Sequence, residues 1–459
     1  MKLYLYNTVT KLKQEFAPLI ENKPKMYVCG PTVYSAPHLG NGLSVIVFDL
    51  LYRVLCHIYG KTHVTYVRNI TDVDDKINNA AKERGITITE LTSEITTIFK
   101  NNTRDLNCLE PNFEPKVTEH IPEIITMIST LIEKGYAYEN SGHVFFEVSK
   151  FKDYGKLAGR KIDELLAGAR IEVSPLKKDP ADFVLWKPET QDYDPSASFA
   201  SPWGNGRPGW HIECSAMSAK YLGADFDIHG GGVDLVFPHH TNEIAQSCCA
   251  NEGSIFANIW LHNGFLTVNG EKMSKSLGNF ITINDLINSK VDGEIIRFHA
   301  LSSHYRKPMD WNENAIVAAK KVLDSFYKII TILDTEMTAD IPQEFFEVLA
   351  DDLNTPAAYA YLHDLARSAN KAATKSEKIT WALKLRSCAN LMGFLEKNPS
   401  EWFKNDNVDT NLIEELLKQR KLAKLEKNYK LADEIRKKID ELNIIVEDNN
   451  DGTTSWRRK

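Results

Sequence analysis

The first seventy residues alternate between apolar and polar segments in the order strand, helix, strand. Residues 25–29 (Lys-Met-Tyr-Val-Cys) form a short apolar run typical of a buried strand, and a loop rich in Gly and Pro follows. The apolar stretch from His38 to Tyr59 predicts a long helix, and residues 62–75 (THVTYVRNITDVDD) predict a strand that leads into polar residues. This order predicts the βαβ unit of a parallel, nucleotide-binding sheet, and thus an α/β fold.

The remaining pattern divides the chain into segments. Residues 111–200 mix helical and strand-like pieces, so they indicate an insertion into the sheet domain, and the strand pattern resumes at residues 226–232 and 259–268. From residue 312 the periodicity is almost entirely helical. We therefore expect the domains and segments to be a sheet domain (1–110 and 201–311), a connective insertion (111–200), an α-helical bundle (312–395), a linker (396–409) and a small C-terminal module (410–459).

Composition narrows the class of protein. The 459 residues are 43% apolar and carry a net charge of −7, so no overall basic character points to a polyanionic partner. The N-terminus has no apolar core typical of a signal peptide, and no run of eighteen apolar residues occurs. Seven cysteines without regular spacing are typical of a reducing compartment. We expect a cytoplasmic protein that does not contact membranes.

A candidate phosphate site lies in residues 31–41 (PTVYSAPHLGN). Ligands of open α/β sheets bind at the carboxyl ends of strands, where a helix N-terminus attracts phosphate. His38 and Asn41 would stand at that helix start, and Gly40 would let a nucleotide approach the backbone.

A second candidate site is the motif Lys-Met-Ser-Lys-Ser at residues 272–276, inside a loop flanked by Gly and Ser. Lys272 and Lys275 could hold a triphosphate and stabilise the charge that develops as pyrophosphate leaves. A solvated lysine turn is the alternative interpretation.

A third constellation could bind a metal ion. Pro238 is suited to the first position of a helix, on which His239 and Glu243 would project from one face, whereas His240 would point elsewhere. Cys214 and Cys29 come from two other segments, and two thiolates, an imidazole and a carboxylate make a suitable Zn²⁺ shell. No C-x-x-C pair occurs, so spacing by itself leaves open whether the four residues meet.

Several sequence motifs together resemble those of a known family. HLGN and KMSKS are similar to the two signatures of class I aminoacyl-tRNA synthetases. CGPTVY, RNITDVDDKI, GRPGWHIECSAM, DIHGGGVDL and FPHHTNEIAQ resemble, in order and spacing, the cysteinyl-tRNA synthetases over essentially the full chain. The resemblance implies a Rossmann-type catalytic domain, the connective insertion, the helical bundle and an anticodon-binding module. One position departs from the family pattern, because Asn41 stands where the first signature usually ends in His.

The same resemblance assigns roles to individual residues. It implies one Zn²⁺ per chain on Cys29, Cys214, His239 and Glu243, where the ion recognises the substrate thiolate. It implies catalysis by His38, Lys272 and Lys275, with ATP and its Mg²⁺ held by these residues together with Gly40 and Asn41. Thr71, Trp210 and Asp234 become candidates for binding the amino acid and ribose, and Gly230, Gly231 and Gly232 for close approach to an adenylate. The substrates implied are L-cysteine, ATP and tRNA(Cys), and the enzyme is expected to be a monomer.

The C-terminal module carries the expected RNA contacts. Residues 418–438 hold nine Lys or Arg and three acidic residues, a basic stretch in an acidic chain. The alternative interpretation of this basic stretch is the solvent-exposed face of an amphipathic helix, without a role in RNA binding. The resemblance makes Arg436, Asp451 and Trp456 candidates for tRNA binding, through phosphate, base-edge or stacking contacts.

Two other functions stay open at this point. A cysteine ligase of thiol biosynthesis would keep the zinc site and adenylation, but it would not need the basic tail. A non-catalytic, zinc-stabilised RNA-binding paralogue would need the tail, but it would not need His38, Lys272 and Lys275.

Overall fold

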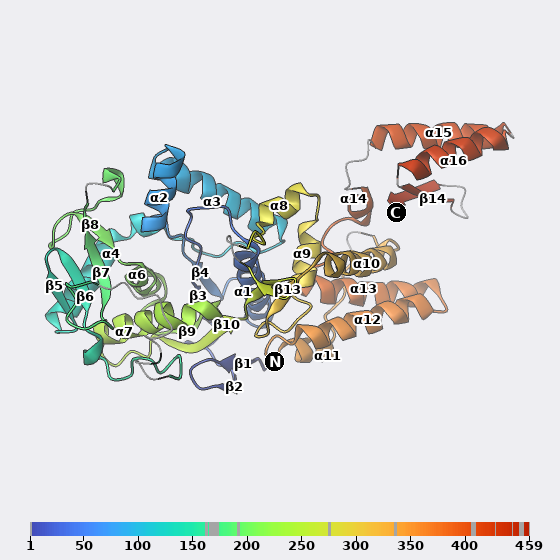
Figure 1. Cartoon of the computed structure of the whole chain (residues 1–459). Helices are drawn as coiled ribbons and strands as arrows, with labels where there is room; N and C mark the ends of the chain where they lie inside the picture. The colour runs from blue at the N-terminus through green and yellow to red at the C-terminus, as the bar shows by residue number, and fades with distance from the viewer. Residues whose placement is uncertain are drawn as a thin grey trace. The chain divides into compact units, whose positions relative to one another are not determined.

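A computed structural model of the chain describes residues 2–160, 164, 174–190, 193–273, 277–334, 337–404, 410–426, 428–442, 444–448 and 454–458 (Figure 1). The chain divides into two compact units. The first unit comprises Met1–Ala319, Ile341–Leu362 and Leu391–Phe394, and the second comprises Lys320–Asp340, His363–Asn390 and Leu395–Lys459.

The first unit is built on a four-stranded parallel sheet, which confirms the predicted α/β class. Its strands lie in the order β10-β9-β3-β4, and the bounds are Ala257–Asn263 (β10), Phe226–Gly232 (β9), Lys25–Val28 (β3) and Thr65–Arg68 (β4). The apolar residues of β3 and β4 are buried on both faces, which explains their continuous rather than alternating pattern. A hairpin of β1 (Tyr4–Asn7) and β2 (Leu12–Glu15) precedes the sheet.

Helix α1 (Leu39–Tyr59) connects β3 to β4 and is the predicted apolar helix. It is long and apolar enough to span a membrane, but 72% of its most apolar window is buried inside the protein, as expected for a core helix. Phe48 of α1 packs so closely on β9 that a Cβ on Gly230 would lie 2.1 Å from its ring. Asp49, also on α1, is bound by Arg53 at 2.9 Å and by Arg297 at 2.5 Å. Phe48 thus packs α1 against the sheet, and the Asp49–Arg297 ion pair ties α1 to Gly293–Ala300 (α9).

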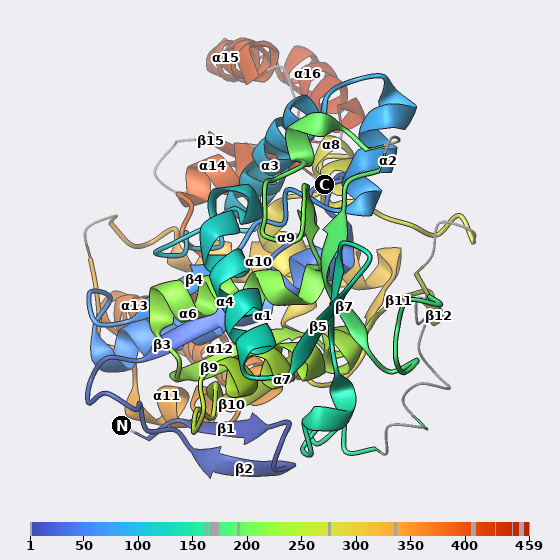
Figure 2. The same cartoon turned by 90° about the vertical axis from the view of Figure 1, so that its left-hand side faces the viewer.

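Three helices pack beside one another around the other side of the sheet. They are α4 (Ile121–Glu133), α6 (Trp210–Leu222) and α7 (Thr241–Ala250). An antiparallel sheet of β5 (Ala137–Asn140), β6 (His143–Phe146), β7 (Phe183–Pro188) and β8 (Gly206–Pro208) lies next to them, and Figure 2 shows its strands β5 and β7 beside these helices. This second sheet begins within the segment predicted to be an insertion, and its last strand leads directly into α6. Helix α6 therefore links the inserted sheet to the parallel sheet.

The first unit contains further helices and a small sheet. Its other helices are α2 (Asp75–Arg84), α3 (Ile88–Asp105), α8 (Ile283–Asn288), α9 (Gly293–Ala300) and α11 (Gln343–Leu349). A three-stranded sheet contains β12 (Glu271–Lys272), β11 (Leu266–Val268) and β13 (Met309–Trp311). Thr87 and Thr282 cap α3 and α8 through reciprocal hydrogen bonds with Glu90 and Asp285, so local sequence sets these helix starts.

The remaining elements are helical apart from a final hairpin. They are α10 (Glu313–Ile330), α12 (Thr355–Lys371), α13 (Lys375–Leu391), α14 (Pro399–Lys404), α15 (Thr410–Leu425), α16 (Tyr429–Glu441), β14 (Ile444–Asp448) and β15 (Thr454–Arg458). In the second unit, α15 and α16 pack on each other and β14 pairs with β15. A small core of Ile413, Ile435, Ile439 and Ile444 holds this C-terminal part together. The domain boundaries expected from the sequence stay predictions.

Candidate functional site

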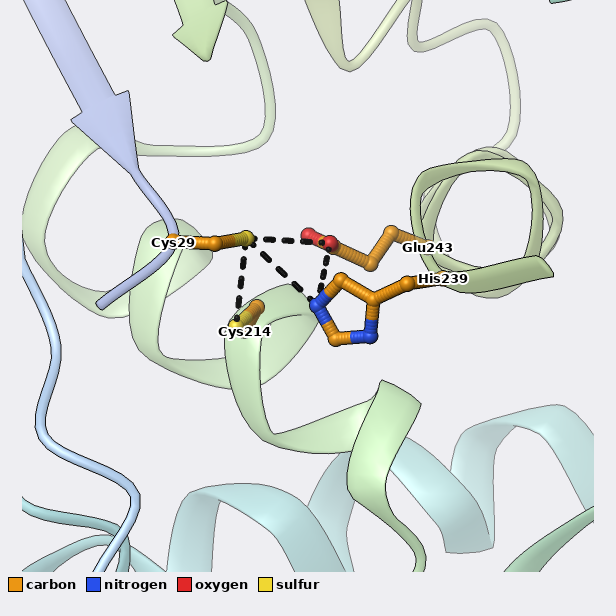
Figure 3. A group of neighbouring side chains, drawn as sticks. All are labelled: Cys29, Cys214, His239 and Glu243. Carbon is orange, nitrogen blue, oxygen red and sulfur yellow. Dashed lines mark hydrogen bonds and ion pairs between the residues drawn. The ribbon is translucent and has the colours of Figure 1, made fainter. Parts of the chain in front are cut away.

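Four potential metal ligands from three parts of the chain meet at the carboxyl edge of the parallel sheet. Cys29 follows β3, Cys214 lies on α6, His239 precedes α7 and Glu243 lies on α7. Figure 3 shows the four side chains pointing toward one another, with their ligand atoms within 4.8 Å of each other. The sulfur of Cys29 lies 3.7 Å from that of Cys214, 3.4 Å from His239 Nε2 and 3.5 Å from Glu243 Oε1. His239 Nε2 lies 3.0 Å from Glu243 Oε1.

The distances between the ligand atoms fit a metal ion with tetrahedral coordination. Ligand bonds of about 2.0–2.3 Å in a tetrahedron place the ligand atoms about 3.3–3.8 Å apart, and three of the four distances fall in this range. The donor set of two sulfurs, one imidazole nitrogen and one carboxylate oxygen is the kind that binds Zn²⁺. The site can therefore hold a metal ion of this class.

Buried charge in the group also calls for a cation. Burial disfavours the charged form of both thiols, and it raises the pKa of Cys29 well above the ordinary value. Burial acts the same way on Cys214, but hydrogen bonds from Cys29 and His239 outweigh it and lower the pKa of Cys214 to about 6. Two sulfurs 3.7 Å apart cannot both ionise in a dry interior without a positive partner. A divalent ion would supply that charge.

Two further histidines enclose the group, and one of them corrects a prediction. His240 was expected to point away, but its Nε2 lies 3.3 Å from the sulfur of Cys29. Helical structure resumes after Phe237, which has extended backbone angles (φ −141°, ψ 133°), in agreement with the expected helix start at Pro238; the regular α-helix α7 begins at Thr241. Both histidines reach the same centre because the sulfur of Cys29 lies close to each of them, 3.4 Å from His239 Nε2 and 3.3 Å from His240 Nε2.

His229 completes the surroundings of Glu243. Its Nε2 lies 2.8 Å from Glu243 Oε2, and its ring stacks on Trp260 at a centroid distance of 4.4 Å. The charges of His229 and His239 and their hydrogen bonds overcome burial and hold the pKa of Glu243 well below its ordinary value. His229 was missed by the sequence reasoning. Its position on a strand directly before three glycines was the available signal.

A cavity of about 550 Å³ opens beside the metal-ligand group. Residues from the loop after β3, the start of α1, the ends of β9 and β10, and the segment 263–273 line it. The sequence-predicted site residues on its wall are Cys29, His38, Gly40, Asn41, Trp210, Asp234 and Lys272. The structure thus brings most of the predicted residues to one hollow at the carboxyl edge of the sheet, where α/β proteins bind ligands.

His38 and Asn41 cap the first helix reciprocally. The backbone N–H of Asn41 donates to His38 Nδ1 at 3.2 Å, and the backbone N–H of His38 donates to Asn41 Oδ1 at 3.1 Å. The capping bond occupies the carbonyl end of the Asn41 amide, so its NH₂ end is the part available for an anion. Asn41 therefore offers the cavity a neutral hydrogen-bond donor.

The predicted lysine pair is only partly described. Lys272 ends β12 with an exposed side chain, and its Nζ lies 6.0 Å from the centre of the Phe265 ring. Lys275 lies outside the described residues. Asn41, Gly40 and Met273 border the same cavity, and a Cβ on Gly40 would lie 4.0 Å from the Met273 methyl group. The described start of the second signature, Lys272 and Met273, therefore faces the first signature across the cavity.

The candidate substrate residues take different positions. Trp210 is 37% exposed and stacks on the His239 ring at 4.3 Å, so it covers the ligand group from the cavity side. Asp234 is exposed on the cavity wall. Thr71 is 1% exposed and lies behind the wall, where its hydroxyl donates to Glu213 Oε2 at 3.0 Å. Glu213 and Asn69, which also bonds Thr71, were missed because nothing in the sequence shows that their segments meet.

The three glycines have a simpler explanation than was expected. A Cβ on Gly230 would meet Phe48, and one on Gly231 would lie 2.9 Å from Leu235 and 3.0 Å from His240. Gly232 is the member of the three that lines the cavity. Close packing on both faces of β9 accounts for Gly230 and Gly231, so ligand approach is left to Gly232.

The candidate tRNA residues belong to the second unit. Arg436 is exposed on α16. Trp456 on β15 packs against the small isoleucine core, so at least part of its ring serves folding. Asp451 lies outside the described residues.

Comparison with known proteins identifies the family. Residues 15–321 match the model of the tRNA synthetases class I (C) catalytic domain, and residues 344–396 match the DALR domain. The cysteine--tRNA ligase of Rickettsia felis is 52% identical over 459 residues, and that of Rickettsia bellii is 51% identical, each covering 100% of both chains. A Mycobacterium tuberculosis methionyl-tRNA synthetase in complex with methionyl-adenylate shares the fold, with a TM-score of 0.57 and 14% identity over 83% of this chain and 93% of its own.

The identity over the full length agrees with the parallel sheet, the two signature segments and the metal-ligand group. The chain belongs to the cysteine--tRNA ligase family of class I aminoacyl-tRNA synthetases.

Proposed function

We propose that this protein ligates L-cysteine to tRNA(Cys) through a cysteinyl-adenylate, using ATP with its Mg²⁺. The observation that carries the proposal is the meeting of Cys29, Cys214, His239 and Glu243 beside the cavity that holds His38 and Asn41. Relatives named as cysteine--tRNA ligases support the same function over the whole chain.

The metal-ligand group would select the amino acid. Zn²⁺ held by these four residues binds a thiolate far better than a hydroxyl, since the thiol deprotonates readily on a soft metal. A pocket that used shape alone would distinguish cysteine from serine by only about 10²-fold. The chain's own part is to bury Cys214, His239 and Glu243 and to leave Cys29 partly exposed on the cavity wall beside Trp210.

The cavity residues would carry out adenylation by positioning and charge. A carboxylate oxygen of cysteine attacks the α-phosphorus of ATP, and the bond from that phosphorus to the bridging oxygen breaks as pyrophosphate leaves. His38, Lys272 and Lys275 would stabilise the migrating negative charge, and the Asn41 amide would add a neutral donor. The ribose hydroxyl at the tRNA terminus then attacks the mixed anhydride and releases AMP. No residue needs to act as a general base in the first step.

The second unit would supply tRNA binding. The DALR match, which lies partly in this unit, and the nine Lys or Arg between residues 418 and 438 support this role. Arg436, Asp451 and Trp456 remain its candidate contacts, in an anticodon-binding module that follows the helical bundle. We further propose a cytoplasmic monomer with one Zn²⁺ per chain.

Cysteine-dependent exchange between ATP and pyrophosphate, followed by charging of tRNA(Cys), tests the proposal. Exchange without charging would favour a thiol-forming cysteine ligase. Absence of both activities in the zinc-loaded protein would favour the non-catalytic paralogue.

A further inference from the structure

Tyr27 on β3 carries a buried hydroxyl next to the metal-ligand group. The residue is 0% exposed, and among the residues that the structure describes no acceptor stands in hydrogen-bonding geometry to its hydroxyl. Buried polar groups are nearly always paired, because an unpaired one has given up its hydrogen bonds to water. The hydroxyl of Tyr27 therefore calls for an acceptor in its immediate surroundings.

Strand geometry places this side chain on the face of the sheet that carries the ligands. Successive side chains of a strand point to opposite faces, so Tyr27 and Cys29 share one face. The strand pairing continues as far as Cys29, whose backbone N–H donates to a carbonyl of β9 at 3.2 Å. Tyr27 stands opposite His229 on β9 with the ring centres 5.3 Å apart, and His229 bonds Glu243 at 2.8 Å. Helix α6, which carries Cys214, packs on β3.

Cys214 is the acceptor within reach of this hydroxyl. Burial raises the pKa of Tyr27 well above its ordinary value, and the negative charge of Cys214 raises it further, ahead of the other metal ligands. Cys214 also acts as a hydrogen-bond acceptor for this phenol, although the hydroxyl must turn toward the sulfur to complete the bond. A phenol that keeps its proton is a donor, and a thiolate is a charged acceptor. The two side chains are therefore matched.

We propose that Tyr27 is a positioning residue of the zinc site, whose hydroxyl donates a hydrogen bond to the sulfur of metal-bound Cys214. The inference rests on the proposed function, and it adds to the four ligands a residue that holds one of them. A thiol loses its proton when it ligates a metal, so Cys214 then offers the charge of a thiolate to the hydroxyl. A hydrogen bond to the charged form stabilises that form in a buried site. Tyr27 thereby orients the sulfur and strengthens zinc binding.

Tyr66 on β4 provides a matched control. It is 1% exposed, and its hydroxyl likewise has no hydrogen-bond partner in the described part of the chain. Tyr66 stands opposite Met26, the neighbour of Tyr27, so its side chain points to the other face of the sheet. There its ring lies 5.1 Å from that of Tyr52 on α1. Tyr66→Phe therefore removes the same buried hydroxyl away from the metal ligands.

The first measurement is the zinc affinity of the full-length protein, by competition with a chelator of known affinity. Tyr27→Phe should weaken zinc binding by about 10- to 100-fold, the usual cost of losing the hydrogen-bond partner of a metal ligand, and Tyr66→Phe should stay within about threefold of the wild type. In the Co²⁺-loaded protein, the charge-transfer absorption from sulfur to cobalt should move to longer wavelength in Tyr27→Phe only. A thiolate without its hydrogen bond gives up electron density to the metal more readily.

Melting of the full chain with and without zinc separates this role from packing. Loss of an unpaired buried hydroxyl costs no hydrogen bond, so without metal both Phe variants should melt at or above the wild-type temperature. Zinc should then raise the melting temperature of Tyr27→Phe less than that of Tyr66→Phe or the wild type, because weaker binding stabilises less. If the chain does not fold without metal, the cobalt spectrum decides.

A cobalt absorption that does not move in Tyr27→Phe would overturn the proposal, whatever the zinc affinity, because the hydroxyl would then have another partner. A wild type that binds no zinc would overturn the zinc site and this inference with it. Cysteine-dependent pyrophosphate exchange by the wild type is measured separately, so failure of the proposed function is distinguishable from failure of this inference.

Discussion

The amino-acid site and the C-terminal module place their charges in opposite surroundings. The group of Cys29, Cys214, His239 and Glu243 is enclosed by the first unit, and Glu243 is completely buried. The lysines of residues 418–438 that the structure describes stand instead on helices whose polar faces are exposed, around a core of four isoleucines. Buried ligands are costly unless a metal pairs with them, whereas exposed cations cost little and act over a distance that salt shortens.

This difference predicts how each region responds to change. A substitution of any one residue in the metal-ligand group should abolish metal binding almost completely, because the ion needs all four ligands. Substitutions in the basic stretch should act in small, additive steps, because each contact with a phosphate is largely independent. The following predictions run from the largest expected effect to the smallest.

Cys214→Ser should abolish both metal and cysteine binding. Zinc content should fall from about one per chain toward zero, and cysteine-dependent pyrophosphate exchange should fall by roughly 10³-fold or more, because a hydroxyl is a poor substitute for a thiolate ligand. Elemental analysis and exchange assays measure the two effects. Cys248→Ser, on α7 but outside the ligand group, is the matched control and should retain metal. A metal-free variant that remained specific for cysteine would contradict the assignment.

Removal of the C-terminal module should separate adenylation from tRNA charging. A cut after Lys404 keeps Trp402, whose ring stacks on Tyr327 at 4.4 Å and whose Nε1 donates to Asp324 at 2.8 Å. Pyrophosphate exchange should be preserved, and charging should fall by about 10²-fold or more through weaker tRNA binding. Residual tRNA binding should also depend less on salt than in the full chain. Unchanged charging would show that the module does not bind tRNA.

Lys275→Ala should slow adenylation without weakening cysteine binding. We expect a rate about 10²-fold lower, the scale for loss of one preorganised group that stabilises the transition state. Rapid quench of adenylate formation and a separate cysteine titration measure the two quantities, with the exposed Lys61→Ala as the control. A normal rate with weakened cysteine binding would instead assign this lysine to the amino acid.

Arg436→Gln should have the smallest effect. Loss of one phosphate contact should weaken tRNA binding several-fold and reduce the slope of log affinity against log salt by about one. Lys375→Gln removes the same charge at an exposed position outside the basic stretch and should leave that slope unchanged. A large, salt-independent loss for Arg436→Gln would indicate base recognition rather than a phosphate contact.

The sequence by itself determined the main helices and strands and the sequence motifs of the site. The apolar runs of β3, β4 and α1 predicted a βαβ unit, because buried parallel strands and a core helix must be continuously apolar. The order of the sequence motifs predicted the family. The residue types of Cys29, Cys214, His239 and Glu243 predicted a set of ligands suited to Zn²⁺. These features depend on local composition, which a linear sequence contains in full.

Only the tertiary structure decided which residues of these motifs come into contact. Cys29 and Cys214 are 185 positions apart, and their sulfurs come within 3.7 Å because β3 and α6 pack together. The sulfur of Cys29 lies 3.4 Å from His239 Nε2 and 3.3 Å from His240 Nε2, so both neighbouring histidines reach one centre because a distant segment packs against them. Asn69 and Glu213 gained their partners in the same way, through hydrogen bonds between distant segments. Long-range packing sets such contacts, and it leaves no periodic trace in the sequence.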